Sequence, residues 1–173
     1  GRLALCESVD CDRRVPRRAR LAYRDVASAG NRLTLIAAIV PARAVTTHTL
    51  FCLKTPVPAA AQEVLCALLN SYVANYLVRL RVNTHVTVSL VSRVPVPVLE
   101  AGHPLFVRLA ACVEALTGRP RPAEEMDDYA EVQAIAAHLY RLTPGQFEHV
   151  LSRFPLVPSE VRQRVLLRFI NFH

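Results

Sequence analysis

QEVLCALLNSYVANYLVRLR, the stretch from Gln62 to Arg81, carries the strongest structural signal in the sequence. Its apolar side chains recur every three or four residues, which places them on one face of a helix. These side chains are Leu65, Leu68, Leu69, Tyr72, Val73, Tyr76, Leu77 and Leu80. The spacing predicts one long helix over 62–81, with Asn70, Asn75 and Arg79 on its other side. We expect this polar face, and Arg81 just beyond it, to meet water or a ligand.

Short apolar and β-branched segments lie on both sides of the predicted helix. Residues 21–26 and 33–40 predict two strands, and residues 28–31 between them are typical of turns, so we expect a hairpin with a long loop. Residues 48–53 predict a third strand. Alternating apolar and polar side chains over 86–90 predict a further strand. The simplest architecture is a sheet packed on one long helix.

The C-terminal part of the sequence predicts only helices. One helix begins at Leu105 and stops at Gly118. Another covers 129–140, and the acidic residues before it lie where the helix dipole favours negative charge. Residues 143–146, Thr-Pro-Gly-Gln, match a capping box with proline at the first helical position, and a last helix follows Pro158. His138 and His149 fall on these helices, where we expect structural roles.

Together these elements predict an α+β fold. It has a small mixed or antiparallel sheet with a long packed helix, followed by an all-helical C-terminal extension. We expect a basic extended lead-in over 1–20, a β-rich basic portion over 21–100 and the helical extension over 101–173. The arginine-rich run over 13–20 is either a solvated segment or an arm that follows phosphates.

Composition places the chain among globular domains. Its 173 residues are 52% hydrophobic and 20% charged with only 5 glycines, unlike collagen-like, disordered or linker sequences. The apolar runs are far shorter than the roughly 20 residues of a membrane-spanning helix, so we expect no membrane partner. The chain begins at Gly1 and its only methionine is Met126, which indicates a piece of a longer protein. Five cysteines without C-x-x-C spacing indicate reduced thiols in a cytoplasmic protein rather than disulfides or a zinc site.

The charge is unevenly distributed along the chain. Residues 1–100 hold 13 basic and 6 acidic side chains, whereas residues 101–173 hold 8 of each, so the net charge of +7 comes from the first part. Every basic residue except Lys54 is an arginine, the side chain suited to a bidentate grip on phosphate and guanine. Nucleic acid is therefore a candidate partner. The alternative is a genome whose composition enriches arginine everywhere.

The sequence lacks the common signatures of catalysis. Its glycines stand alone, so no G-x-G-x-x-G turn or phosphate loop can form. There is no Asn/Asp-Pro-Pro-aromatic motif of an amino-methyltransferase, and no acidic residue stands two positions before Lys54, as a common nuclease site needs. H-E-x-x-H and G-x-S-x-G are also absent, although composition leaves a serine, histidine and acid triad open. We expect this chain to have no enzymatic activity, metal or cofactor of its own.

Several segments resemble one family in order and spacing. In the first part they are RLAYRDVA (20–27), NRLTLIAAIVP (31–41), TTHTL (46–50), LLNSY (68–72), YLVR (76–79), TH (84–85) and VPVP (94–97). They resemble the C-terminal region of large bacterial DNA adenine methyltransferases and fused type IIG restriction-modification enzymes, which carry a TaqI-like specificity domain. Residues 131–140, LTPGQF (142–147) and FPL (154–156) are similar to the helical extension of these proteins. The resemblance covers about residues 20–160, but the family often has Asn-Glu-Arg-Thr where this chain has Asn-Arg-Leu-Thr at 31–34.

The resemblance implies that residues 21–100 form a target-recognition domain for double-stranded DNA. Methylation, with S-adenosylmethionine as cofactor, and any DNA cleavage would belong to a catalytic methyltransferase portion of the same polypeptide. The side chains expected to contact DNA are Arg24, Arg32, Arg43, Thr46, Thr47, His48, Arg79, Arg81, Asn83, Thr84, His85 and Arg93. Three structural alternatives stay open: an ion pair between Arg24 and Asp25, a turn cap at Thr46 and Thr47, and a helix bend at Asn70-Ser71.

Two other functions remain possible. The charge-balanced helical part suits a protein-docking module, which would bind the catalytic portion or another subunit of a phage-defence or restriction-modification complex. RNA binding is the third candidate, but the chain has no tryptophan, is only 6% aromatic and has no stacking motif of the RRM type.

Overall fold

The computed structural model describes residues 17–117 and 122–172, so most of the predicted lead-in lies outside the described residues. The sheet contains β1 (Arg20–Arg24), β2 (Ala37–Val40) and β3 (Leu50–Cys52) in the order β2-β1-β3. Both pairings are antiparallel, with Arg20 opposite Val40 and Ala22 opposite Cys52. The hairpin predicted from the first two segments is confirmed, although both later strands are shorter than predicted.

The single long helix predicted over 62–81 is wrong, because the chain forms two helices there. Helix α1 covers Ala59–Leu69 and α2 covers Tyr72–Arg79. Between them Ser71 has an extended backbone, and its side chain accepts a hydrogen bond from the Ala74 amide at 3.2 Å. Ser71 is therefore the N-cap of a new helix. The helix bend at Asn70-Ser71, one of the structural alternatives, is the one that the structure contains.

Asn70 and Asn75 explain both the break and the late start of β2. Asn70 pairs with both backbone groups of Ala37, at 2.9 Å each, as a neighbouring strand would. Asn75 is fully buried, and its Oδ1 accepts the amides of Thr34 and Leu35 at 3.0 and 2.8 Å. The Thr34 and Leu35 amides are thus bonded to a helix side chain instead of a strand, and strand-like pairing with β1 resumes at Ile36, whose carbonyl accepts the Arg24 amide at 3.0 Å. The expectation that both asparagines face water or a ligand is wrong.

The strand predicted over 86–90 is also wrong. The structure has a short helix there, α3 (Val88–Val91), whose N-cap Thr87 accepts the Leu90 amide at 3.3 Å. The only sheet-like pairing beside it within the described residues is an isolated bridge between Val26 and His85. Of the alternating apolar side chains, Val86 is buried before the helix begins, whereas Val88 and Leu90 are half-buried in it; Val91 is the buried residue of α3.

The helical C-terminal region follows the local sequence signals closely. It contains α4 (Pro104–Leu116), the 3-10 turn η1 (Ala123–Glu125), α5 (Asp127–Leu139), α6 (Pro144–Ser152) and α7 (Ser159–Ile170). The capping box predicted at Thr143 and Gln146 is present, and α7 begins directly after Pro158. Helix α4 ends near the predicted stop, while Gly118 itself lies outside the described residues.

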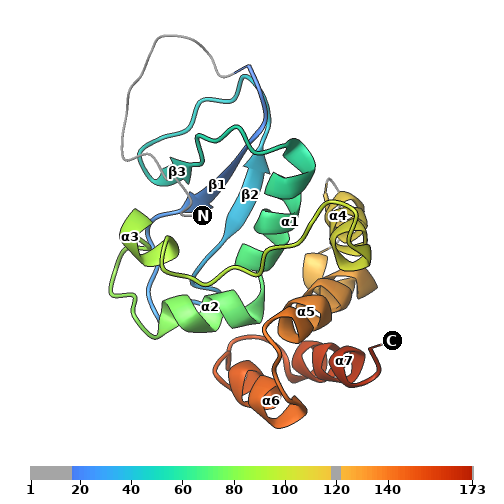
Figure 1. Cartoon of the computed structure of the whole chain (residues 1–173). Helices are drawn as coiled ribbons and strands as arrows, with labels where there is room; N and C mark the ends of the chain where they lie inside the picture. Colours follow the sequence, from blue (N-terminus) through green and yellow to red (C-terminus); the bar gives the residue numbers. More distant parts are fainter. Residues whose placement is uncertain (1–16, 118–121, 173) are drawn as a thin grey trace.

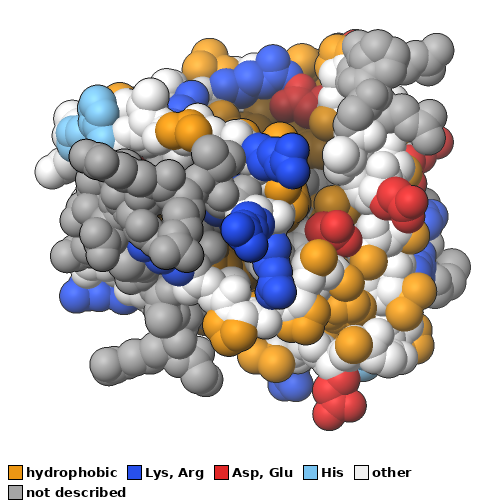
Figure 2. All heavy atoms as spheres, turned by 90° about the horizontal axis from the view of Figure 1, so that it is seen from above, with side chains coloured by type: hydrophobic (Ala, Val, Ile, Leu, Met, Phe, Trp, Pro, Cys, Tyr) orange, Lys and Arg blue, Asp and Glu red, His pale blue; other side chains and the backbone are white. Residues whose placement is uncertain are grey.

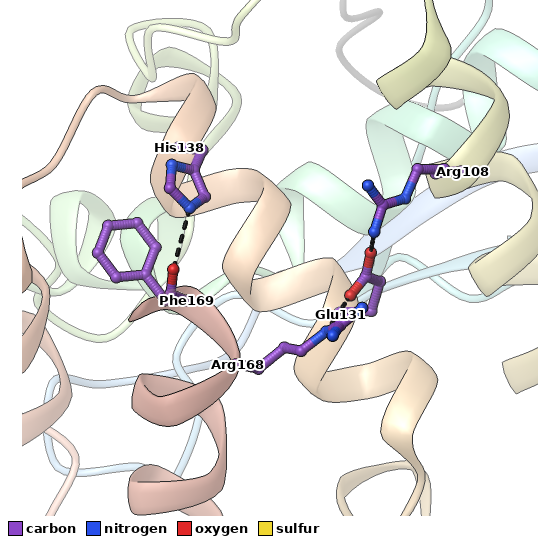
Figure 3. A network of polar contacts seen from close by, with 5 residues as sticks. All are labelled: Arg108, Glu131, His138, Arg168 and Phe169. Carbon is purple, nitrogen blue, oxygen red and sulfur yellow. Dashed lines mark hydrogen bonds and ion pairs between the residues drawn. The ribbon is translucent and has the colours of Figure 1, made fainter. Parts of the chain in front are cut away.

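Polar contacts fasten these helices to one another (Figure 3). Glu131 on α5 forms ion pairs with Arg108 of α4 and Arg168 of α7. On the same helix, His138 places its Nε2 atom 3.1 Å from the carbonyl oxygen of Phe169 on α7. Its ring packs 4.3 Å from the Phe169 ring, so His138 has the structural role expected of it.

Helix α1 lies between the sheet and helices α4 and α5 (Figure 1), and apolar clusters connect these layers. One cluster lies between the sheet, α1 and α2 and includes Leu21, Leu35 and Val78. Two further clusters join α1 and α2 to the later helices, around Tyr72 in one and Leu68 in the other. The fold is therefore a three-stranded antiparallel sheet packed against helices, followed by a largely helical C-terminal region, an α+β architecture. None of the helices in the described part of the chain is long and apolar enough to cross a membrane.

Candidate nucleic-acid interface

The sheet brings five basic side chains to one end. Arg20 opens β1, where it lies opposite the last residue of β2. On its other side the Leu53 amide donates to the Leu21 carbonyl at 2.7 Å, so Lys54 follows at the same end. Arg20 Nη2 also donates to the carbonyl of Ala44 at 2.9 Å, which holds the β2–β3 loop there. The basic sheet end is formed by Arg17, Arg18, Arg20, Arg43 and Lys54.

No carboxylate of the described residues pairs with these side chains. All except the half-buried Arg20 are exposed, and none takes part in an ion pair within the described part of the chain. Figure 2 looks onto this end from above and shows Lys and Arg side chains gathered in its middle, with most Asp and Glu side chains toward the right. Clustered positive charge of this kind attracts polyanions such as nucleic-acid phosphates.

Arg43 has an unusual backbone at the start of the β2–β3 loop. Its φ of 65° lies in the left-handed region, which few residues other than glycine adopt. The Arg43 side chain is exposed, so side-chain packing does not explain the left-handed backbone. Arg141 has the same kind of backbone (φ 55°), so this conformation alone assigns no role to Arg43. Arg43 is the one predicted DNA contact that lies at the basic sheet end.

Two loops with polar side chains meet at the other end of β1, around Asp25. Its amide donates to the Thr49 carbonyl at 2.9 Å, and its own carbonyl accepts the Val86 amide at 2.7 Å. Asp25 Oδ2 lies 3.0 Å from His85 Nδ1, so Asp25 pairs with His85 and the alternative ion pair with Arg24 is not formed. These bonds bring together six predicted contacts or their neighbours: Thr47, His48, Thr49, Asn83, Thr84 and His85. We call this group the Asp25 end.

Thr46 and Thr47 of the β2–β3 loop differ in burial and in their hydrogen-bond partners. Thr46 is half-buried and its Oγ1 lies 3.4 Å from Cys52 Sγ. Thr47 is exposed, and its Oγ1 is hydrogen-bonded to Thr49 Oγ1 at 2.8 Å. The Thr47 carbonyl accepts the Leu50 amide at 3.2 Å, which forms the turn before β3. Thr47 and the exposed His48 are therefore available for contact with a ligand, whereas Thr46 has a mainly structural role.

The remaining predicted residues do not form one surface. Arg24 is half-buried and donates to the Leu33 carbonyl at 3.4 Å, and Arg32 is paired with Glu124. Arg81 and Arg93 are exposed and make no hydrogen bond or ion pair among the described residues. They lie after α2 and α3, respectively. Of the predicted arginines, Arg43, Arg81 and Arg93 thus have freely accessible charges.

Arg79 is bound within the protein. Its Nε donates to Thr34 Oγ1 at 3.2 Å, and its two terminal nitrogens donate to the carbonyl oxygens of Asn31, Arg32 and Arg153. The guanidinium also lies 4.2 Å from the centre of the Phe154 ring. Burial, and secondarily the charge of Arg153, lowers the pKa of Arg79 from its ordinary value. The guanidinium therefore joins the loop before β2 to the end of α6 instead of projecting freely toward DNA.

Sequence reasoning placed Arg17, Arg18 and Arg20 in a basic lead-in but did not include them, or Lys54, among the specific contacts. The signal for the arginines is the run over 13–20, of which residues 13–16 lie outside the described residues. Lys54 gives no such signal, because only the antiparallel pairing of β1 and β3 brings it beside Arg20.

We also examined the described residues for metal-ligating groups and reactive thiols. They contain no group of three His, Cys, Asp or Glu side chains that could hold a metal ion. Burial raises the pKa of Cys66 to about 12 and that of Cys112 to about 11, so both thiols stay protonated at neutral pH.

No protein family, curated protein or solved structure matches this chain.

Proposed function

We propose that this chain is a DNA target-recognition domain of a larger protein, with the basic sheet end holding phosphates and the Asp25 end reading bases. The observation that carries the proposal is the convergence of five cationic side chains from three segments, with no carboxylate paired to them within residues 17–117 and 122–172. The sequence resemblance supports the same role. It assigns the chemistry to a catalytic methyltransferase portion that uses S-adenosylmethionine, with or without a fused endonuclease.

The two ends of β1 suit two tasks. At about 3.4 Å per residue, the five steps from Arg20 to Asp25 span about 17 Å, the length of about five base-pair steps. Contacts to phosphates fix the position of a protein on the duplex but carry little sequence information. The neutral side chains at the Asp25 end, among them Thr47, Asn83 and Thr84, are of the types that form hydrogen bonds with base edges. In this proposal the first end positions the duplex and the second discriminates between sequences.

The test removes two free charges and compares a matched control. Arg43→Asn with Lys54→Ala removes two phosphate contacts, and asparagine tolerates the left-handed backbone at position 43. We expect weaker binding to every duplex, with the slope of log affinity against log salt reduced by about 2. Arg141→Asn with Arg153→Ala is the control, because Arg141 has the same left-handed backbone (φ 55°) and both side chains are exposed.

Fluorescence anisotropy on labelled duplexes at several salt concentrations measures this slope, with circular dichroism to verify folding. Equal losses in the two double variants, or binding that ignores salt, would rule out the basic sheet end as the phosphate contact. The same preparation, incubated with S-adenosylmethionine and DNA, should neither methylate nor cut.

A further inference from the structure

A groove separate from the basic sheet end lies where the sheet portion meets the helical region. It has a volume of about 430 Å³, within the range of ligand pockets. The loop of residues 29–32, the C-terminal end of α2 and the segment after α6 line it. We call it the Arg79 groove.

The Arg79 groove is positively charged. Arg32, Arg79 and Arg153 line it, and no Asp or Glu does. Arg32 is paired with Glu124, which lies outside the lining, whereas the oxygen partners of Arg79 are neutral carbonyls and a hydroxyl. Neutral oxygens solvate a guanidinium but do not cancel its charge. Arg153 is exposed and lacks an ion pair among the described residues, so at least two charges are available to an anionic ligand.

The rim of the groove is apolar. Leu80, which directly follows α2, and Leu156, which follows α6, are each 60% exposed, and both line the groove. Two exposed leucines in one groove offer apolar surface that a ligand with aliphatic side chains would cover. The ligand should therefore combine negative charge with an aliphatic side chain.

These features favour a protein segment over a nucleic acid or a free phosphate. Arg79 already donates to four protein oxygens, so its charge acts on a bound anion mainly through space, while Arg153 is free to pair with it. A free phosphate or a DNA backbone has no aliphatic group to cover Leu80 and Leu156, whereas a peptide segment has both kinds of group. We propose that the Arg79 groove docks an acidic segment of a partner protein that carries leucine-type side chains. This proposal stands independently of DNA binding at the sheet end.

The experiment uses the full chain and a soluble synthetic peptide that is rich in Asp and Glu and contains two leucines. Fluorescence polarisation should detect saturable binding. Arg153→Ser with Leu156→Ser should weaken this binding about tenfold or more, since it removes one charge and one apolar contact. The control is Arg141→Asn with Leu167→Ser, because Leu167 is 59% exposed on α7, and its affinity should stay within about twofold.

Three comparisons identify what the groove recognises. Peptides with Asn and Gln for the acids, or with Ser for the leucines, should bind more weakly than the parent peptide. The Arg43→Asn, Lys54→Ala variant should keep its affinity for the peptide while it loses DNA. Loss of peptide binding in that variant, equal losses in the groove and control variants, or displacement of the peptide by pyrophosphate or duplex DNA would each overturn the proposal.

Discussion

Arg79 and Arg81 stand two positions apart and have opposite surroundings. The Arg79 side chain makes four hydrogen bonds and packs on Phe154, whereas Arg81 is exposed and unpaired among the described residues. We expect Arg79→Ala to lower the free energy of unfolding by about 1–3 kcal/mol, because bonds from a charged group contribute more than neutral ones. Arg81→Ala should change it by less than about 0.5 kcal/mol.

Urea unfolding followed by circular dichroism measures both values. If Arg79→Ala proved as stable as Arg81→Ala, the bridge between the loop before β2 and the end of α6 would contribute nothing to the fold. The comparison also bears on DNA binding. Any loss of affinity in an Arg79 variant has to be corrected for unfolding, whereas a loss in an Arg81 variant reports directly on contact.

Ser71, between α1 and α2, interrupts a sequence that is periodic enough for one helix. The buried Ser71 hydroxyl accepts the Ala74 amide and donates to the Leu68 carbonyl at 2.6 Å. In one continuous helix, Ser71→Ala would raise stability, because alanine is the better helix former. With Ser71 as a buried N-cap, the same change should lower the free energy of unfolding by about 1–2 kcal/mol.

Thermal or urea unfolding determines the sign of the change. Ser152→Ala is the matched control, since the Ser152 hydroxyl donates only to the His149 carbonyl at 2.7 Å and the residue is exposed. We expect that variant to stay within about 0.5 kcal/mol of the parent. A Ser71→Ala protein more stable than the parent would contradict the N-cap role.

The elements that the sequence predicted well depend on neighbours in the chain. The capping box at Thr143 and the proline before α7 act within one helical turn, so the C-terminal helices follow from local patterns. The helix break depends on Asn70 bonding to Ala37, and the late start of β2 depends on Asn75 bonding to Leu35. Those partners are 33 and 40 positions apart, and a periodicity of apolar residues carries no information about them.

The candidate site, like the fold, was predictable where it depends on composition and not where it depends on contacts between distant segments. An excess of arginine indicated the basic half, and Arg43 was identified within it. Register across the sheet, however, decides that Lys54 joins Arg20, and tertiary contacts decide that Arg79 is bound by carbonyls. Charge composition predicts a basic surface, but only the fold determines which of its charges are free.

The chain as a whole should behave as one cooperative unit, despite its division into a basic β-rich part and a neutral helical part. Val64 and Leu68 of α1 pack against the later helices, and the Tyr72 amide at the start of α2 donates to Gln133 of α5 at 2.8 Å. Tyr72 itself is fully buried with Phe154, their ring centres 5.0 Å apart. Removal of the helical part would expose this surface to water.

We therefore expect residues 1–100, produced alone, to lack a cooperative thermal transition. The apolar side chains that α1 and α2 bury against α4–α7 would lose about 25 cal/mol for each Å² returned to water, and domains of this kind are only marginally stable. In the full chain, circular dichroism and tyrosine fluorescence should report one coincident transition, as two-state unfolding requires. A fragment of residues 1–100 that unfolded cooperatively and bound DNA with the salt dependence of the full chain would show that the basic part is an autonomous domain. The shared interior around Tyr72 and Leu68 predicts the opposite, because the helices that support the sheet are themselves supported by the helical region.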